Sequence, residues 1–198
     1  RHNTYSAYVV EMLYFLTGHR PVHRAFADER NVDRVRKLLL ISDKDRTNPT
    51  NTRIVPLLEV ALRQIDKYQR HVARLAVSQP HWAQLRPYKT ASRRRPAVFT
   101  IDTRNPKVWG YIVSKDLERF RRGYLQAVSN LQRSYLSSRL EEMGCRGAYI
   151  DAFLGHWHSG LNPFSVYSTL PAATLAEILR PLLEEIAAQD GWEAIDAP

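Results

Sequence analysis

Five residues of this sequence have side chains that together could cut and rejoin a phosphodiester. In chain order they are Arg20, Lys44, Arg133, His156 and Tyr167. The fork of an arginine guanidinium binds two non-bridging phosphate oxygens at once. A lysine whose pKa falls near phosphates and cations can give up a proton to a leaving oxygen. A tyrosine can form a covalent phosphodiester that keeps the bond energy for religation, so this chemistry requires neither ATP nor a metal ion.

The short segments around these residues resemble the active-site signature of the tyrosine recombinases, the phage-integrase-like enzymes that cut DNA with a tyrosine nucleophile. The segments are Thr17-Gly18-His19-Arg20, Asp43-Lys44-Asp45 before Thr52-Arg53-Ile54-Val55-Pro56-Leu57, Asn130-Leu131-Gln132-Arg133, Phe153-Leu154-Gly155-His156 and Phe164-Ser165-Val166-Tyr167. Each segment alone occurs by chance in many proteins. Their order and near-family spacing over about 150 residues are much more specific.

The resemblance implies a role for each position. Arg20 and Arg133 would bind the scissile phosphate, Lys44 on a β-hairpin would be the general acid, and Tyr167 would be the nucleophile. His156 lies in the family's third box. Lys37 is the nearest alternative to Lys44. The resemblance covers residues 5 to 170, which correspond to the family's catalytic domain, and the DNA-clamping N-terminal domain usual in the family is absent from this chain.

The sequence departs from the family pattern at three places. Asn130 stands where a histidine is usual, and an amide can donate a hydrogen bond but cannot exchange protons near neutral pH. His23 follows Arg20 by three residues, where a carboxylate usually supports the site. The candidate nucleophile follows the third-box histidine by eleven residues, against a commoner nine. We hypothesise that His158 or His23 compensates for Asn130, which normal cleavage by His158→Ala and His23→Ala variants would contradict.

Each of these residues also has a structural interpretation. Arg20 could be a surface arginine at a helix start, and Arg133 could form a surface ion pair with Glu141 or Glu142. Likewise, the third-box histidine could cap a helix and the candidate nucleophile could be a packed aromatic. Zinc is not expected, because His156 and His158 have no further cysteine, histidine or carboxylate nearby to complete four ligands.

The charge of the chain points to a polyanionic partner. The net charge is +9, from 29 Lys+Arg against 20 Asp+Glu, and arginine carries most of it. Guanidinium groups match phosphate oxygens, and their binding releases counterions, so double-stranded DNA is the expected partner. The alternative is a solvated basic surface. The clusters expected to contact the DNA backbone are Arg93, Arg94, Arg95, Arg119, Arg121 and Arg122. A further basic cluster comprises Arg30, Arg34 and Arg36.

The bulk composition indicates a globular domain in a reducing compartment. A chain of 198 residues fits one domain, and Cys145 as the only cysteine excludes an internal disulfide. No apolar run approaches the roughly 18 residues of a membrane span, and no helix pairs the arginine clusters with a bulky apolar face, so no membrane partner is expected. The resulting expectation is a cytoplasmic protein, associated with the nucleoid in a bacterium or nuclear in a eukaryote.

Hydrophobic spacing predicts an α+β fold that is mainly α. We expect helices over 5–16, 21–27, from Pro56 to just before Ser78, over 114–128, from Asn130 to Gly144, over 146–153 and over 172–188. Runs 37–42 and 53–55 predict a hairpin whose long tip carries Lys44. Residues 79–113 lack helical period and contain strand-like pieces at 98–101 and 108–113. Residues 1–170 would be the catalytic domain, and 171–198 a helical tail that packs on the same domain or docks in trans.

The favoured function is a site-specific DNA recombinase or integrase that forms a 3′-phosphotyrosyl intermediate and assembles as a dimer or tetramer on DNA, without a cofactor. One alternative is a type IB topoisomerase-like or telomere-resolving enzyme, which shares the chemistry without two-site exchange. Another is a DNA-binding protein whose catalysis has decayed. A metal-dependent nuclease is disfavoured, because no carboxylate cluster lies near the basic segments.

Overall fold

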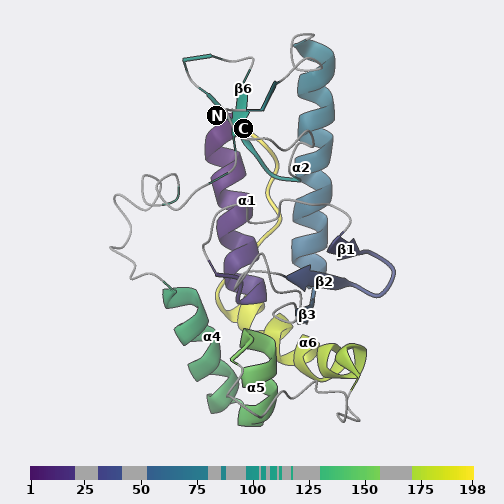
Figure 1. Cartoon of the computed structure of the whole chain (residues 1–198), viewed down its shortest axis with the longest axis vertical. Coiled ribbons are helices and arrows are strands. Elements are labelled where there is room, and N and C mark those ends of the chain that lie inside the picture. The colour runs from purple at the N-terminus through teal and green to yellow at the C-terminus, as the bar shows by residue number, and fades with distance from the viewer. Residues whose placement is uncertain are drawn as a thin grey trace.

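The computed structural model describes residues 1–20, 31–41, 53–79, 86–87, 97–102, 104–105, 108–110, 112, 117, 130–156 and 171–198. These residues form a mixed α+β fold that is mainly helical, as expected, with two small sheets and a C-terminal helix (Figure 1). The first half contains α1 His2–Thr17, β1 Val32–Asp33, β2 Leu38–Ile41, β3 Arg53–Pro56 and α2 Glu59–Ser78. The second half contains β4 Arg86–Pro87, β5 Thr100–Ile101, β6 Val108–Gly110, α4 Leu131–Glu142, α5 Gly147–Leu154 and α6 Ala172–Gln189.

Helix α1 is the central helix of the core. Its side chains are buried on most sides, because α2, α4 and β5 all contact it. The helix ends at Gly18, which has a left-handed φ of 58°. Glycine adopts this conformation without a steric penalty, so the predicted helix end is confirmed. The chain therefore leaves α1 at a defined point and places Arg20 just beyond it.

The predicted hairpin is confirmed as the antiparallel pair β2 and β3, with Leu39 opposite Val55. Strand β1 extends this sheet on the β2 side and was not predicted. The prediction that Pro56 opens the next helix is wrong, because Pro56 is the last residue of β3 and pairs with Leu38. Leu57 and Leu58 are buried between the two elements, and α2 begins at Glu59.

The region predicted to be irregular and partly β contains the second sheet. Strand β6 is central, with β5 antiparallel on one side and β4 parallel on the other. The strands β5 and β6 are shorter than the predicted runs, and β4 was not predicted. Asn3 of α1 bonds both the N–H and the carbonyl of Ile101, which fixes this sheet beside the start of α1.

The three C-terminal helices match their predicted spans within about two residues. Asn130 precedes α4 as predicted, but its side chain makes no capping hydrogen bond among the described residues. Helix α6 follows Pro171 and packs on β3 and α4 of the same chain, and its Leu179 and Leu183 are buried. The helices predicted over 21–27 and 114–128 lie outside the described residues, apart from Leu117.

After α6 the chain turns at Gly191 and runs back along α1 and α2 as an extended strap, residues 192–196 (Figure 1). The hydroxyl of Tyr5 donates to the Ile195 carbonyl at 3.0 Å, and the Ile195 N–H donates to Oε1 of Gln64 at 2.8 Å. Trp192 packs against Phe15 with ring centroids 5.3 Å apart. Both ends of the described chain therefore belong to one core.

Among the described helices, none combines the length and the apolar character that crossing a membrane would require.

Candidate functional site

A pocket of about 460 Å³ opens where the end of α1, the start of α4 and the end of α5 meet. It is lined by Arg20, Asn130, Arg133, Ser134, Ser137, Ser138, Leu154 and His156. Three of the five candidate catalytic residues thus lie around one hollow, although they come from segments far apart in the sequence. No carboxylate is among the described residues that line the pocket.

Arg133 joins the three segments that form the pocket. Its Nη1 donates to the Gly18 carbonyl at 2.6 Å, and its Nη2 donates to the Leu154 carbonyl at 2.5 Å and contacts His156 Nε2 at 3.0 Å. Its side chain is 5% exposed, so the alternative of a surface ion pair with Glu141 or Glu142 is wrong. Arg139, six residues further along α4, makes the surface ion pair with Glu142 instead.

Two glycines allow the segments to approach each other. A Cβ on Gly18 would lie 2.9 Å from Leu154 Cδ2, and a Cβ on Gly155 would lie 3.2 Å from Nη1 of Arg53. Both glycines have left-handed φ angles, 58° and 66°. Where these segments meet, the Gly18 carbonyl accepts hydrogen bonds from two guanidinium groups. Besides Arg133, Arg53 donates to it from Nη2 at 2.8 Å.

Arg53 is a buried residue of the site that the sequence interpretation treated only as part of a strand. It is 4% exposed and lies on β3 opposite Ile41. The alternation of side chains along the strand could have identified it in the sequence. Arg53 is two residues before the fully buried Val55, so both side chains lie on the inward face of the strand. An arginine at an inward strand position is rarely buried without hydrogen-bond acceptors.

His156 lies at the rim of the pocket and is partly exposed. Arg133 Nη2 can only donate, so Nε2 of His156 accepts, and the proton of the neutral ring lies on Nδ1. Nδ1 faces Asp151 Oδ1 at 3.5 Å. Burial and the charge of Arg133 lower the pKa of His156, with a smaller lowering effect from Arg20, and the nearby Asp151 carboxylate opposes them. The imidazole therefore remains neutral to a lower pH than an ordinary histidine.

Asn130 occupies the turn that starts α4. Its φ is 70°, and its carbonyl accepts the backbone N–H groups of Arg133 at 3.0 Å and Ser134 at 3.2 Å. Asparagine is one of the few residues other than glycine that tolerates this backbone region. The residue thus orients the first turn of α4 and lines the pocket at the same time.

Three serines complete the wall of the pocket and were not singled out from the sequence. Ser134, Ser137 and Ser138 follow Arg133 at positions that share one face of a helix. That spacing was the signal that could have identified them. Their hydroxyl groups can donate hydrogen bonds to a bound anion.

The remaining candidate site residues lie outside the described residues, and the structure does not place them. They are His23, Lys44, Arg93, Arg94, Arg95, Arg119, Arg121, Arg122, His158 and Tyr167. Lys37, the alternative to Lys44, is described, and its Nζ lies 2.8 Å from Oε2 of Glu59. Its ammonium group therefore already has a carboxylate partner on α2.

Part of the basic character of the sequence is neutralised locally. Arg34 forms an ion pair with Asp66, and Arg36 pairs with Asp33 at 3.4 Å. These two members of one arginine cluster therefore offer less charge to a partner than the sequence suggested. Within the described ranges, no group of three or more His, Cys, Asp or Glu side chains could hold a metal ion.

No protein-family model matches the chain, and no significant match was found among curated proteins or solved structures.

Proposed function

We propose that this chain is the catalytic domain of a tyrosine-recombinase-like DNA strand transferase, which cuts and rejoins DNA through a 3′-phosphotyrosyl link at Tyr167. The observation that carries the proposal is the convergence of Arg20, Arg133 and His156 on one pocket. The resemblance of the short sequence segments to the tyrosine-recombinase signature requires these three side chains to converge. The spacing of the residues along the chain does not by itself impose this convergence.

The chemistry of the pocket suits a phosphate. Two guanidinium groups, a neutral imidazole and three serine hydroxyls face a hollow whose described lining contains no carboxylate. Positive donors fixed in advance stabilise the charge that develops on the non-bridging oxygens of a phosphorane-like transition state. In this proposal Arg20 and Arg133 bind the phosphate, His156 holds the Arg133 guanidinium in place through Nε2, Lys44 protonates the leaving 5′-oxygen and Tyr167 attacks.

Covalent trapping tests the proposal. The protein is incubated, without metal or ATP, with nicked oligonucleotide duplexes tiled across the DNA that flanks its gene. A nick near the scissile bond lets the leaving fragment diffuse away, so an adduct accumulates and survives denaturation. The proposal predicts an adduct that is lost in Tyr167→Phe and retained in the matched variant Tyr149→Phe.

The position of the adduct provides a second criterion. Peptide mapping should locate the nucleotide on Tyr167, and Arg20→Ala should abolish the adduct, because it removes one of the two guanidinium groups that line the pocket. An adduct on another residue, or an adduct that requires a divalent metal, would contradict the proposal.

One observation favours a second candidate, a DNA-binding protein that does not cleave. The Arg133 guanidinium already bonds two backbone carbonyls and His156, and this arrangement would be retained in a protein that needs Arg133 only for its fold. Specific DNA binding without any adduct across the complete tiling, with an unchanged affinity in Tyr167→Phe, would support this candidate.

A further inference from the structure

Helix α2 carries a second basic surface, which is separate from the pocket. Arg63, Lys67, Arg70 and Arg74 are spaced by four, three and four residues, so at 3.6 residues per turn they lie within an arc of about 60°. The buried residues Ala61, Ile65, Tyr68 and Val72 occupy the opposite side of the helix. We call these four cations the α2 stripe. In Figure 1, α2 runs from the β1–β3 sheet away from α4 and α5, so the stripe leads away from the pocket.

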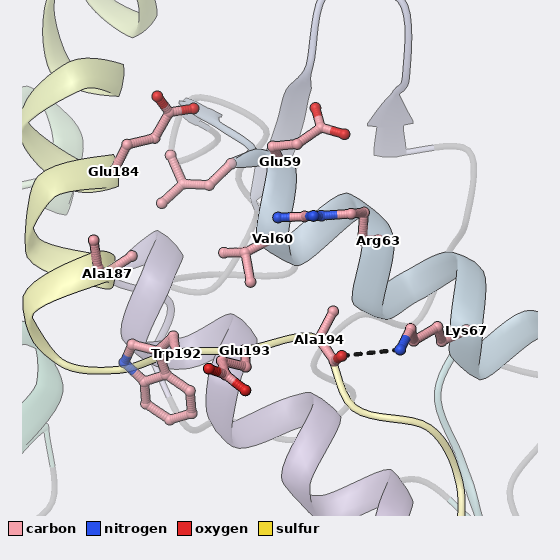
Figure 2. A pocket seen from close by; sticks show the side chains of 11 residues that line it. Glu59, Val60, Arg63, Lys67, Glu184, Ala187, Trp192, Glu193 and Ala194 are labelled. Carbon is pink, nitrogen blue, oxygen red and sulfur yellow. Dashed lines mark hydrogen bonds between the residues drawn. The ribbon is translucent and has the colours of Figure 1, made fainter.

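The stripe carries charge that is only partly compensated. Arg63, Arg70 and Arg74 are exposed and form no ion pair with any described residue. Near the N-terminal end of α2, Arg63 and Lys67 border a hollow of about 550 Å³. Its lining also contains three acidic residues, Glu59, Glu184 and Glu193 (Figure 2). The C-terminal part of the stripe, from Lys67 to Arg74, is therefore its strongly positive section.

One anionic group of the chain already lies on this section. Lys67 Nζ donates to Asp196 Oδ2 at 2.9 Å and to the Ala194 carbonyl at 3.0 Å, the second of which Figure 2 shows. The hydrogen bond from Lys67 and the charges of Lys67, Arg70 and Arg74 together lower the pKa of Asp196. A carboxylate from the C-terminal strap thus occupies a place that a phosphate oxygen could take.

We propose that the α2 stripe is a DNA-backbone interface and that Asp196 of the strap competes with DNA phosphates for Lys67. Lys67 and Arg74 are seven residues apart, which is about 10 Å along a helix axis, or about three phosphates of one DNA strand. Cations on one face of a rigid helix suit contacts that position DNA without reading its sequence. This inference rests on the proposed function only for the choice of DNA as the ligand.

The dependence of DNA affinity on salt tests the stripe. The full chain is titrated into a fluorescently labelled duplex of mixed sequence between about 50 and 200 mM salt, where each phosphate contact contributes about 0.9 to the slope of log affinity against log salt. We expect Arg70→Ala/Arg74→Ala to weaken binding and to reduce the slope by roughly two. The control is Arg36→Ala, which removes an exposed charge that Asp33 already neutralises.

Asp196→Asn tests the competition. Removing the resident carboxylate should tighten binding several-fold and steepen the slope by up to about one, because Lys67 then releases a solution counterion when DNA binds. Glu177→Gln makes the same change in net charge on the exposed face of α6 and should leave the slope unchanged. If Asp196→Asn behaves like Glu177→Gln, the competition is disproved.

Failure of this inference is distinguishable from failure of the proposed function. The proposed function is tested by the Tyr167-dependent adduct of the wild-type protein, whereas the stripe is tested by the salt slope of DNA affinity, so either can fail while the other holds. An Arg70→Ala/Arg74→Ala double variant with the slope of Arg36→Ala would overturn the interface. A changed sedimentation coefficient of the free protein in that variant, with unaltered DNA affinity, would instead indicate a protein-docking surface and would also overturn it.

Discussion

Arg133 bonds the backbone carbonyls of Gly18 and Leu154 and the ring of His156 with one guanidinium, and no carboxylate is among the described residues that line the pocket. Backbone carbonyls satisfy its hydrogen bonds without cancelling its field. Burial, and after it the charge of Arg133, lower the pKa of His156. A pocket lined by two arginines, with no carboxylate among its described lining residues, is suited to an anionic ligand.

Removal of the Arg133 side chain tests its structural role. Arg133→Ala leaves the carbonyls of Gly18 and Leu154 buried without these donors, and we expect it to lower the free energy of unfolding by about 2–4 kcal/mol. The measurement is urea denaturation. The control is Arg139→Ala on the same helix, whose partly exposed ion pair with Glu142 should cost less than about 1 kcal/mol. Equal losses in the two variants would contradict a structural role for Arg133.

The charges around His156 predict the direction of two pKa changes. The Arg20 charge lowers the pKa of His156, so Arg20→Gln should raise that pKa. The Asp151 charge raises it, so Asp151→Asn should lower the pKa of His156 further. An NMR titration of the His156 ring protons measures both changes. Two changes of the same sign would contradict the geometry of the site.

The lowered pKa of His156 in the folded protein predicts how stability depends on pH. Because the folded state holds the pKa of His156 below its ordinary value near 6.5, the unfolded chain binds more protons at this residue. The contribution of His156 to the free energy of unfolding therefore falls as the pH decreases from about 6.5 to the lower folded pKa, and it is constant below that. Comparing urea denaturation of the wild type and His156→Gln across this window isolates the effect.

At the scale of elements, the ends of the helices determine the geometry of the pocket. Helix α1 stops at Gly18 and α5 stops at Gly155, and both left-handed glycines turn the chain where the helices meet. A Cβ on Gly18 would meet Leu154 and Phe153, so glycine allows the end of α1 to lie close to α5, and the Gly18 carbonyl there accepts hydrogen bonds from Arg53 and Arg133.

Alanine substitutions at two glycines separate the free-energy cost of the left-handed backbone from the cost of a packing clash. In Gly144→Ala the new Cβ meets nothing within 4 Å, so at φ 75° the loss should be only the left-handed cost of about 1–2 kcal/mol. In Gly18→Ala the Cβ would also clash with Leu154, and we expect a further loss of about 1–3 kcal/mol. Chemical denaturation of both variants measures the difference. A Gly18→Ala variant no less stable than Gly144→Ala would contradict the close packing of α1 on α5.

At the scale of the whole molecule, α6 and the strap close the core of their own chain. Leu175, Leu179 and Leu183 of α6 are buried, and the strap bonds side chains of both α1 and α2. The alternative of docking in trans would require these contacts to come from a second subunit.

Adjacent residues of α6 test this packing. Leu179 is fully buried and Ile178 is 36% exposed, so Leu179→Ala should cost about 2–5 kcal/mol and Ile178→Ala less than about 1 kcal/mol. Thermal unfolding of the wild type should not depend on protein concentration. A melting temperature that rises with concentration would instead indicate docking between subunits.

Local patterns were sufficient to predict most elements of the described fold. Apolar spacing predicted α1, α2, α4, α5 and α6, and the glycines at 18, 144 and 155 marked three helix ends. These features depend on residues within one or two turns of each other, so they can be recognised without the fold. The two-residue strands β1 and β4 were missed, because such short strands exist only through pairing with distant segments.

The sequence by itself determined which residues could bind a phosphate, since the resemblance of short segments selected Arg20, Arg133 and His156 before any geometry was known. Only the tertiary structure decided that they share one pocket, that Arg53 joins them through the Gly18 carbonyl, and that Arg34, Arg36 and Lys37 have local carboxylate partners. The physical reason is that residue type determines what a side chain can donate or accept, whereas its partners depend on contacts between distant segments. Burial and neighbouring charge, which adjust the pKa of His156, likewise exist only in the folded chain.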